Sequence, residues 1–548
     1  MATVRDRYSE EEVQGFYASG FWQSGTLFDL VAAQADARPG KVFVTDGTSS
    51  LTYQELHDRA LQLALGFKHL GLRRGDRVTV QLPNWTEFVL TTVALERLGV
   101  IAVPIMPIYR ADEVGYILGH AGAKAAITCE EFRGFRYLDM YASLRKENPE
   151  LQSLIVVRGS NPVGSDAATR LTDLIIKEPL EDIARRLGPP PSPDDPFMIV
   201  YTSGTTSRPK GCLHTFNTLR ASAAAIAKSL GYQESDVQFG PSPITHGTGL
   251  VTSFALPLLA GASSHLMEKW EALEGLHRIR EHGCTVAVTA TAFLQMLTDA
   301  YDTDRHDLRD LRLWVCAGAP IPGSIVQRAR DLLPGCRVLS LYGRTENFLT
   351  TLCTVDDAPE KSIHSDGSAV EGAVISIVDE LGREVPRGTE GDIAYRGPSH
   401  MLGYFRDPEA TAALFTPDGF SRSGDLGFMD DDGYVRVTGR IKDIVIRGGL
   451  NISARELEDL LVEHRAVGSV AVVGMPDERL GEKVCAYVVP AHGQPAPALE
   501  DLTSYLRRRK VATPKLPERL ELVEQLPLSA TGKVLKHVLR DDIARKLT

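Results

Sequence analysis

The sequence predicts an α/β protein with a large N-terminal domain of helix-flanked sheets and a small C-terminal α/β domain. Short apolar runs alternate with helical patterns through the first 130 residues, which favours a mostly parallel sheet covered by helices. A similar alternation returns over residues 441–548. The chain has 548 residues, too many for one domain of about 100–200 residues.

The first elements follow from the spacing of apolar residues. A helix is expected after residue 51 because Ala60, Leu61, Ala64 and Phe67 fall on one face. Three further elements follow in order: a strand over 77–82, a helix over 87–98 and a strand over 100–104. We assign this part of the chain to the core.

Composition excludes several classes of protein. Hydrophobic residues make up 43% and charged residues 24%, as in a soluble globular protein. The net charge is −11 without a long basic tract, so nucleic acid is not the expected partner. Seven scattered cysteines form no C-x-x-C pair and predict reduced thiols. A charged N-terminus and the lack of an apolar run of about 18 residues predict a cytoplasmic protein without a membrane span.

The stretch after residue 200 is rich in groups that bind phosphate. A proline-rich connector at 188–196 leads into a short apolar strand at 197–200. The next eleven residues, 201–211, contain five Ser or Thr side chains, two glycines, an arginine and a lysine. Glycine lets backbone N–H groups turn toward a ligand, hydroxyls donate hydrogen bonds, and the cations balance negative charge. The segment therefore predicts a phosphate-binding loop, and it differs from the Walker A sequence.

Three later segments suit the other parts of a nucleotide. A strand over 311–317 ends in the small residues 318–320, against which a flat ring can lie. The strand over 337–341 ends in Tyr-Gly-Arg-Thr-Glu at 342–346. There a tyrosine can stack on a purine, a threonine can donate to phosphate, and a carboxylate can hold Mg²⁺. Asp425, after a glycine turn, can accept ribose hydroxyls, although such an aspartate is also common in Asx turns.

These motifs, in this order, resemble the adenylate-forming superfamily, which includes acyl-CoA synthetases, adenylation domains of peptide synthetases and beetle luciferases. The signature loop corresponds to residues 202–211, with Ser207 where a third glycine is usual. Thr-Gly-Arg-Ile-Lys-Asp at 438–443 resembles the interdomain junction, and Pro-Leu-Ser-Ala-Thr-Gly-Lys at 527–533 resembles the last motif. The resemblance extends from about residue 26 to residue 540.

The resemblance implies binding of ATP and Mg²⁺ at these motifs. The implied nucleotide-binding residues are Thr202, Ser203, Gly204, Thr205, Thr206, Lys210, Gly318, Ala319, Pro320, Tyr342, Gly343, Asp425 and Arg440. Lys533, Thr345 and Glu346 are implied as catalytic, and Glu346 also as the metal ligand. Arg344 occupies a variable position and is open between contact with phosphate, CoA or substrate and a solvated charge, with solvation as the default.

The resemblance also implies two domains and a rotation between them. It places the adenylation domain at 1–439, a hinge at 440–442 that turns at Lys442, and a mobile C-terminal domain at 443–548. Gly448 and Gly449 lie on the face that reaches the active site in CoA-using members. Two consecutive glycines let the pantetheine arm of CoA pass close to the backbone.

The site for the acid is expected near residues 241–249. The residues alone favour a turn role for the histidine in this segment, whereas the resemblance assigns His246, Gly247 and Gly249 to the acyl pocket. Family members that activate hydroxybenzoates commonly have an asparagine where this chain has Gly247. A hydroxybenzoate is therefore disfavoured.

The prediction is an ATP-dependent carboxylate–CoA ligase for a small aliphatic or alicyclic acid. The chain looks most like short- or medium-chain fatty acid or cyclohexanecarboxylate CoA ligases. A ligase that loads a fatty or aryl acid onto a carrier protein is the alternative, and a non-catalytic nucleotide-binding protein is a minor one. A homodimer is compatible with these motifs, which do not determine the oligomeric state or the acid.

Overall fold

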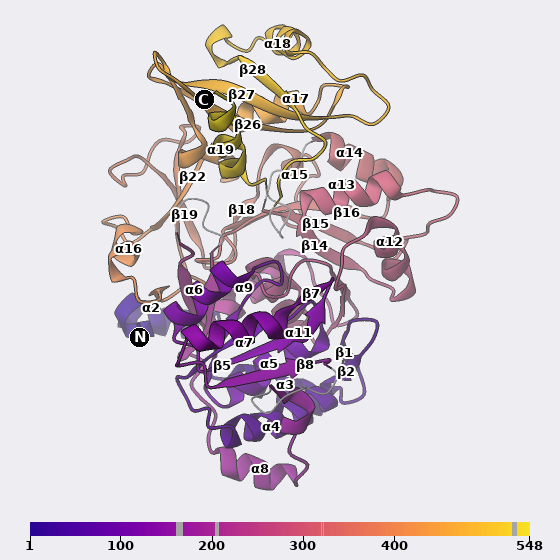
Figure 1. Ribbon diagram of the computed structural model, residues 1–548, viewed down its shortest axis with the longest axis vertical. Coiled ribbons are helices and arrows are strands. Elements are labelled where there is room, and N and C mark those ends of the chain that lie inside the picture. The colour runs from indigo at the N-terminus through magenta and orange to yellow at the C-terminus, as the bar shows by residue number, and fades with distance from the viewer. Residues whose placement is uncertain (160–167, 203–207, 319–320, 322, 529–533, 548) are drawn as a thin grey trace.

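Four main sheets make up the structure, a computed structural model that describes residues 1–159, 168–202, 208–318, 321, 323–528 and 534–547 (Figure 1). Two large sheets lie in the N-terminal part, a third sheet follows them, and a fourth lies near the C-terminus. The predicted α/β class is confirmed.

The first sheet is parallel over six neighbouring strands. Its order is β21 (Gly403–Tyr404), β11 (Gly211–Thr215), β10 (Pro196–Tyr201), β4 (Ile101–Pro104), β3 (Arg77–Gln81), β5 (Ala125–Cys129), β8 (Ser153–Val157) and β9 (Thr169–Arg170). β10 pairs antiparallel with β11, and the two strands enclose the predicted phosphate loop. The predicted strands near residues 77, 100 and 197 are thus confirmed as β3, β4 and β10.

The second sheet is also parallel at its centre. Its order is β18 (Ser368–Ala369), β17 (Thr351–Leu352), β16 (Arg337–Tyr342), β15 (Leu313–Ala317), β14 (Val286–Ala290), β12 (Val237–Gly240), β13 (Ser263–Leu266), β1 (Val42–Thr45) and β2 (Ser50–Thr52). The carboxyl ends of β14, β15 and β16 lie side by side. Ligands of parallel sheets bind beyond such ends.

Helices cover these sheets and pack with them in two main cores. The longer helices are α2 (Glu10–Ala18), α3 (Leu27–Ala37), α4 (Tyr53–His69), α5 (Thr86–Arg97), α6 (Ala111–Ala121), α7 (Tyr137–Glu147), α8 (Leu180–Leu187), α9 (Phe216–Ser229), α12 (Ala272–Glu281), α13 (Thr291–Ala300) and α14 (Gly323–Leu332). The second core contains α12, α13 and α14 against one face of the second sheet. α4 begins at a capping box, in which Thr52 and Glu55 satisfy each other's backbone N–H groups. α5 is buried along nearly its whole length, including its polar residues Thr91, Thr92 and Glu96.

Short helices complete this part of the chain. They are α1 (Val4–Arg7), α10 (Gly247–Gly249), α11 (Leu256–Ala260), α15 (Lys361–His364) and α16 (Pro408–Ala413). A two-stranded ribbon of β6 (Glu131–Phe132) and β7 (Phe135–Arg136) precedes α7.

The third sheet is antiparallel and leads into the C-terminal part. It contains β19 (Val374–Val378), β20 (Gly391–Arg396), β22 (Ser421–Met429) and β23 (Val435–Arg440). A single-turn helix, Ile441–Asp443, follows β23 directly. The predicted hinge residues 440–442 therefore begin at the last residue of β23 and continue into this single-turn helix, before the next strand of the chain.

The C-terminal sheet has helices on both faces. It is built from β24 (Val445–Arg447), β25 (Leu450–Ile452), β26 (Val467–Asp477), β27 (Gly481–Pro490) and β28 (Arg519–Leu522), with α17 (Ala454–Leu461), α18 (Leu499–Arg508) and α19 (Lys536–Leu547). Alternate residues of β26 enter different cores: Val472 packs with α17 and α18, whereas Val473 packs with α19. In Figure 1 this unit lies at the top, beside the second and third sheets.

No helix in the described part of the chain is both long enough and apolar enough to span a membrane.

Candidate active site

The base of the predicted phosphate loop is closed by two hydrogen bonds between Thr202 and Lys210. The N–H of Thr202 donates to the carbonyl oxygen of Lys210 at 2.9 Å, and the N–H of Lys210 donates to the Thr202 hydroxyl at 3.2 Å. The ammonium of Lys210 lies 4.8 Å from the ring centroid of Tyr404. The predicted loop residues Ser203, Gly204, Thr205 and Thr206 lie outside the described residues.

A cavity of about 480 Å³ opens between the carboxyl ends of the second sheet and the third sheet. Predicted site residues that line it are Thr202, His246, Gly247, Gly318, Gly343, Thr345, Glu346, Asp425, Arg440 and Lys442. Lys210, Tyr342, Gly249, Gly448 and Gly449 do not line this cavity. Ala319 and Pro320 lie outside the described residues. Segments more than 200 residues apart in sequence thus meet around one hollow.

Tyr342, Asp425 and Arg440 form one connected group. The Tyr342 hydroxyl donates to Asp425 Oδ2 at 2.7 Å, and Arg440 Nε donates to Asp425 Oδ1 at 2.9 Å. Asp425 and Arg440 are also partners across the β22–β23 ladder. The Asp425 carboxylate raises the pKa of Arg440, and burial raises the pKa of Tyr342 well above its usual value. Both carboxylate oxygens of Asp425 are therefore held in place before any ligand binds.

Glu346 is fixed from the first sheet. The Tyr404 hydroxyl donates to Glu346 Oε1 at 2.7 Å, and the N–H of Met401 donates to the Glu346 carbonyl oxygen at 2.7 Å. Burial, followed by the nearby Glu346 charge, raises the pKa of Tyr404. Tyr404 lies in β21, two residues of an edge strand, and the sequence offers no signal that it would meet a residue 58 positions earlier.

His214 supports Thr345, the residue before Glu346. Its Nε2 lies 2.8 Å from the carbonyl oxygen of Thr345, so Nε2 must carry the proton. Burial lowers the pKa of His214 to about 4 and keeps the ring neutral at pH 7. The ring stacks on Phe348 with 4.2 Å between centroids. This histidine sits inside β11, where the sequence indicates only a buried strand.

Arg344 contacts the protein backbone. Its Nη1 donates to the carbonyl oxygen of Arg422 at 2.6 Å, and its Nη2 donates to that of Ser421 at 2.9 Å. The default interpretation of Arg344 as a solvated charge is therefore wrong. Two N–H groups of the guanidinium fork thus reach two neighbouring backbone acceptors on β22. Arg344 links the 342–346 turn to the strand that carries Asp425.

Part of the cavity lining is apolar. The apolar lining residues are Pro243, Ala290, Phe293, Ala317, Leu341, Phe348 and Ile441. A Cβ on Gly247 would lie 3.2 Å from Phe348 Cδ1, and a Cβ on Gly249 would lie 2.3 Å from the carbonyl oxygen of Pro243. Gly249 thus lets two backbone segments approach closely, and Gly247 leaves room beside an aromatic ring.

A second cavity of about 280 Å³ lies between the third sheet and the C-terminal unit. Tyr342, Asp425 and Lys442 line it together with Val534 and Lys536. Lys533, the predicted catalytic lysine, lies outside the described residues and immediately precedes Val534.

The glycine pair lies elsewhere. Gly448 and Gly449 are exposed in the β24–β25 hairpin at φ 57° and 84°, and they line neither of these two cavities. In this structure the C-terminal unit therefore faces Tyr342 with the part that contains Val534 and Lys536, whereas Gly448 and Gly449 face solvent.

Comparisons with known proteins agree with this arrangement. A profile of the AMP-binding enzyme family matches residues 31–405, and a profile of the AMP-binding enzyme C-terminal domain matches residues 456–533. The chain is 34% identical over 542 residues to a medium-chain fatty-acid–CoA ligase of Escherichia coli (strain K12), covering 99% of this chain and 94% of that protein.

Two further similarities bear on the chemistry. The chain is 32% identical over 540 residues to a salicyl-AMP ligase/salicyl-S-ArCP synthetase of Mycobacterium tuberculosis (strain H37Rv), covering 97% and 93% of the two chains. A crystal structure of an anthranilate CoA ligase in complex with anthranoyl-AMP superposes with a TM-score of 0.87 at 27% identity. That match covers 96% of this chain and 98% of the solved one.

Proposed function

Because this chain belongs to the AMP-binding enzyme family, we propose that it is an AMP-forming acid–CoA ligase that uses ATP to activate a small aliphatic or alicyclic acid. The supporting observation is the 480 Å³ cavity, which joins an apolar wall to Thr345, Glu346, Asp425 and Arg440. An acyl chain and a nucleotide can meet there.

The first step would form an acyl-adenylate. The carboxylate oxygen attacks the α-phosphorus of ATP, and pyrophosphate leaves with the electrons of the broken P–O bond. No general base is needed because the nucleophile is already an anion. Negative charge grows on the phosphates, so fixed donors and cations lower the barrier. We assign this role to the 202–211 loop, Thr345 and Lys533, and we assign ribose binding to Asp425.

A Mg²⁺ ion fits this site in one respect. Proteins usually hold Mg²⁺ through one or two carboxylates together with substrate phosphates. Glu346 offers one carboxylate, fixed by Tyr404, in the wall of the cavity. The described residues contain no cluster of three or more ligating side chains, so phosphate oxygens would supply most ligands. When bound, the ion would offset charge on the leaving pyrophosphate.

The second step would transfer the acyl group to CoA. The thiol sulfur attacks the acyl carbon, a C–S bond forms, and AMP leaves. We propose that residues 443–548 rotate about Lys442 against 1–439, which withdraws Lys533 and brings Gly448 and Gly449 toward the cavity. The hairpin turn itself favours glycine at both positions, because φ is 57° and 84° there. The assignment is supported by the exposure of both glycines, which leaves their backbone open to a ligand.

The choice of acid is supported by the lining residues. Phe293, Leu341 and Phe348 would contact the acyl group, and burial of apolar surface favours binding by about 25 cal/mol per Å². Gly247, in place of an asparagine, supplies no side-chain polar group for a ring hydroxyl. Both features favour an aliphatic or alicyclic acid over a hydroxybenzoate.

One alternative has specific support. The Mycobacterium tuberculosis relative is described as loading salicyl groups onto a carrier protein, and it is 32% identical to this chain. An acyl-adenylating ligase that uses a carrier protein would form the same adenylate. It would differ in the thiol that accepts the acyl group.

The test is ATP-dependent pyrophosphate release across a panel of acids, with and without CoA. The panel contains butyrate to dodecanoate, cyclohexanecarboxylate, benzoate, salicylate and a dicarboxylate. We expect CoA-dependent turnover with an aliphatic or alicyclic acid. Pyrophosphate release without any CoA thioester would favour the carrier-protein alternative, and salicylate as the best substrate would contradict the proposed acid.

A further inference from the structure

Asn84 lies in the turn after β3 and is buried, with 6% of its surface exposed. Its side-chain nitrogen lies within hydrogen-bond distance of three carbonyl oxygens, those of Gly240 (3.2 Å), Ser242 (2.9 Å) and Met267 (3.0 Å). Its side-chain oxygen accepts from the N–H of Ile244 at 2.8 Å. One amide thus joins the first sheet to the segments that follow β12 and β13 of the second sheet.

The segment that Asn84 contacts forms part of the lining of the 480 Å³ cavity. Between the end of β12 at Gly240 and the start of α10 at Gly247 the chain belongs to no helix or strand. Ser242 and Pro243 line the cavity, next to His246 and Gly247. Asn84 contacts this segment at residues 240, 242 and 244. The Asn84 side chain is thus a main support of this segment. The segment is also held by the Ser242 hydroxyl, which donates to the Val288 carbonyl oxygen, and by the N–H of His246, which donates to that of Pro243.

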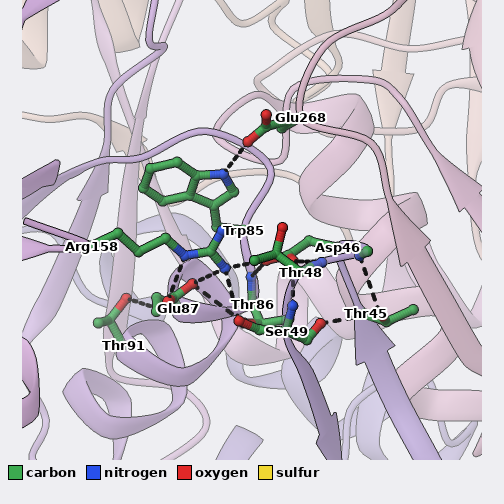
Figure 2. Close-up of polar contacts among 11 residues, drawn as sticks. Thr45, Asp46, Thr48, Ser49, Trp85, Thr86, Glu87, Thr91, Arg158 and Glu268 are labelled. Atoms are coloured by element: carbon green, nitrogen blue, oxygen red, sulfur yellow. Dashed lines mark hydrogen bonds and ion pairs between the residues drawn. The ribbon is translucent and has the colours of Figure 1, made fainter. Parts of the chain in front are cut away.

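The turn that carries Asn84 is itself held on several sides (Figure 2). The Trp85 indole donates to Glu268 Oε2 at 2.5 Å, and the Thr86 N–H donates to Asp46 Oδ2 at 3.1 Å. Arg158 forms an ion pair with the buried Asp46, and its guanidinium lies 4.4 Å from the Trp85 ring centroid. These contacts come from the ends of β1, β8 and β13, so the backbone at residue 84 has little freedom to move.

We propose that Asn84 is a positioning residue for the acyl site, which sets the placement of residues 240–246 and thereby of His246 against the bound acid. The inference rests on the proposed function, since it concerns the same cavity. Asn84 itself lines neither the 480 Å³ cavity nor the 280 Å³ cavity and would touch neither acid nor nucleotide. Its effect would be confined to the acid because Thr345, Asp425 and Arg440 lie on other elements.

The hydrogen-bonding groups of the Asn84 amide can be changed by substitutions that alter its shape little. An amide offers two donors and one acceptor group, and all three are used here. Asn84→Asp has nearly the same shape but would place a carboxylate oxygen against three carbonyl oxygens. Asn84→Ser is a milder change that shortens the side chain and keeps a hydroxyl. Buried polar groups that lose their partners are costly, so the 240–244 segment should move to reach other donors or water.

The test compares the acid with ATP. For Asn84→Asp and Asn84→Ser we expect kcat/KM for the acid to fall at least tenfold, while KM for ATP stays within twofold. The relative rates with hexanoate, decanoate and cyclohexanecarboxylate should also change. Glu268→Ala is the matched control, because it removes the Trp85 contact next door without touching residues 240–244; its acid profile should stay like that of the wild type.

Equal losses for acid and ATP, or unchanged acid kinetics in a folded variant, would overturn the proposal. Absence of turnover by the wild-type enzyme with every acid would instead contradict the proposed function. Hydrogen exchange of the wild-type protein is an independent test that needs no activity and no variant. The Ile244 amide should exchange slowly although it belongs to no helix or strand, and fast exchange there would contradict the role of Asn84.

Discussion

At the scale of single residues, the central group is Tyr342, Asp425 and Arg440. Asp425 is buried and accepts hydrogen bonds from both partners at 2.7 and 2.9 Å. A carboxylate held in this way needs no reorganisation to receive a ribose, and such preorganisation is what makes polar groups effective in binding and catalysis. The resemblance to the family predicts all three residues as nucleotide-binding, and the fold adds that they contact one another.

Replacing Asp425 with alanine should weaken ATP recognition selectively. The variant loses two acceptor oxygens and leaves Arg440 without its charged partner. We expect kcat/KM for ATP to fall on the order of 100-fold, equivalent to about 2.7 kcal/mol, while KM for the acid changes little. Steady-state kinetics with each substrate varied in turn would measure this, with Asp430→Ala as a surface control. A uniform loss for both substrates would argue against a ribose contact.

The buried His214 should make stability depend on pH. Its pKa is about 4 in the folded protein and near 6.5 when unfolded, so the unfolded state binds more protons between these values. Stability is therefore full above about pH 6.5 and is lost as the pH falls toward 4, by about 3 kcal/mol from this residue. We expect His214→Phe to show a smaller drop in Tm between pH 7.5 and pH 5 than the wild type. An unchanged drop would contradict a neutral, buried His214.

At the scale of elements, the segment around α10 lines the cavity beside Phe348, where we propose that the acyl group binds. A Cβ at Gly247 would approach Phe348 to 3.2 Å, closer than ordinary van der Waals contact, whereas a Cβ at Gly249 would collide with backbone at 2.3 Å. Phe348 also has a positive φ of 55°, unusual for a bulky residue, and its ring is packed against His214. The ring can therefore move little to accommodate a neighbour.

Gly247→Ala should consequently narrow the acyl pocket. We expect the optimum chain length to shift toward shorter acids, with a loss of about 10- to 200-fold for the longest good substrate, as is typical of one methylene-sized change. Phe348→Ala should shift the optimum the opposite way. Relative kcat/KM values of both variants across butyrate to dodecanoate would measure these shifts. The same chain-length profile in Gly247→Ala and Phe348→Ala would indicate that the acyl chain binds elsewhere.

Helices and strands whose apolar residues repeat at a regular spacing could be predicted from the sequence. Contacts between residues far apart in the chain could not. β3, β4 and α5 lie within two residues of their expected bounds because their apolar patterns are local. The contacts of Tyr404 with Glu346 and of Arg344 with the backbone of β22 join positions 58 to 78 residues apart. No local pattern encodes such pairs. The roles of all the predicted site residues stay predictions, and the positions of Ala319, Pro320, Lys533 and residues 203–206 lie outside the described part of the chain.

At the scale of the whole molecule, the C-terminal unit and the N-terminal sheets share the second cavity but keep separate cores. Separate cores let two bodies move relative to one another without loss of packing. The connection between the third sheet and β24 is short, from Arg440 to Val445, and Lys442 lies in its middle. This geometry is compatible with rotation at the proposed hinge.

The two half-reactions should therefore respond to different variants. Lys533→Ala is expected to cripple pyrophosphate release while leaving ATP affinity largely intact. Gly449→Val should preserve adenylate formation and slow thioester formation at least tenfold, because a branched side chain at φ 84° is strained and would obstruct the pantetheine arm. Single-turnover assays of each half-reaction separate these outcomes. Unchanged pyrophosphate release by Lys533→Ala would overturn its assignment.

The most direct test of the account is product analysis of one reaction with octanoate, ATP and CoA. We expect AMP, pyrophosphate and octanoyl-CoA in equal amounts, together with octanoyl-AMP when CoA is omitted. Cyclohexanecarboxylate would serve as a second acid for the same measurement. Formation of ADP, or of adenylate that never passes to CoA with any acid of the panel, would contradict an AMP-forming acid–CoA ligase.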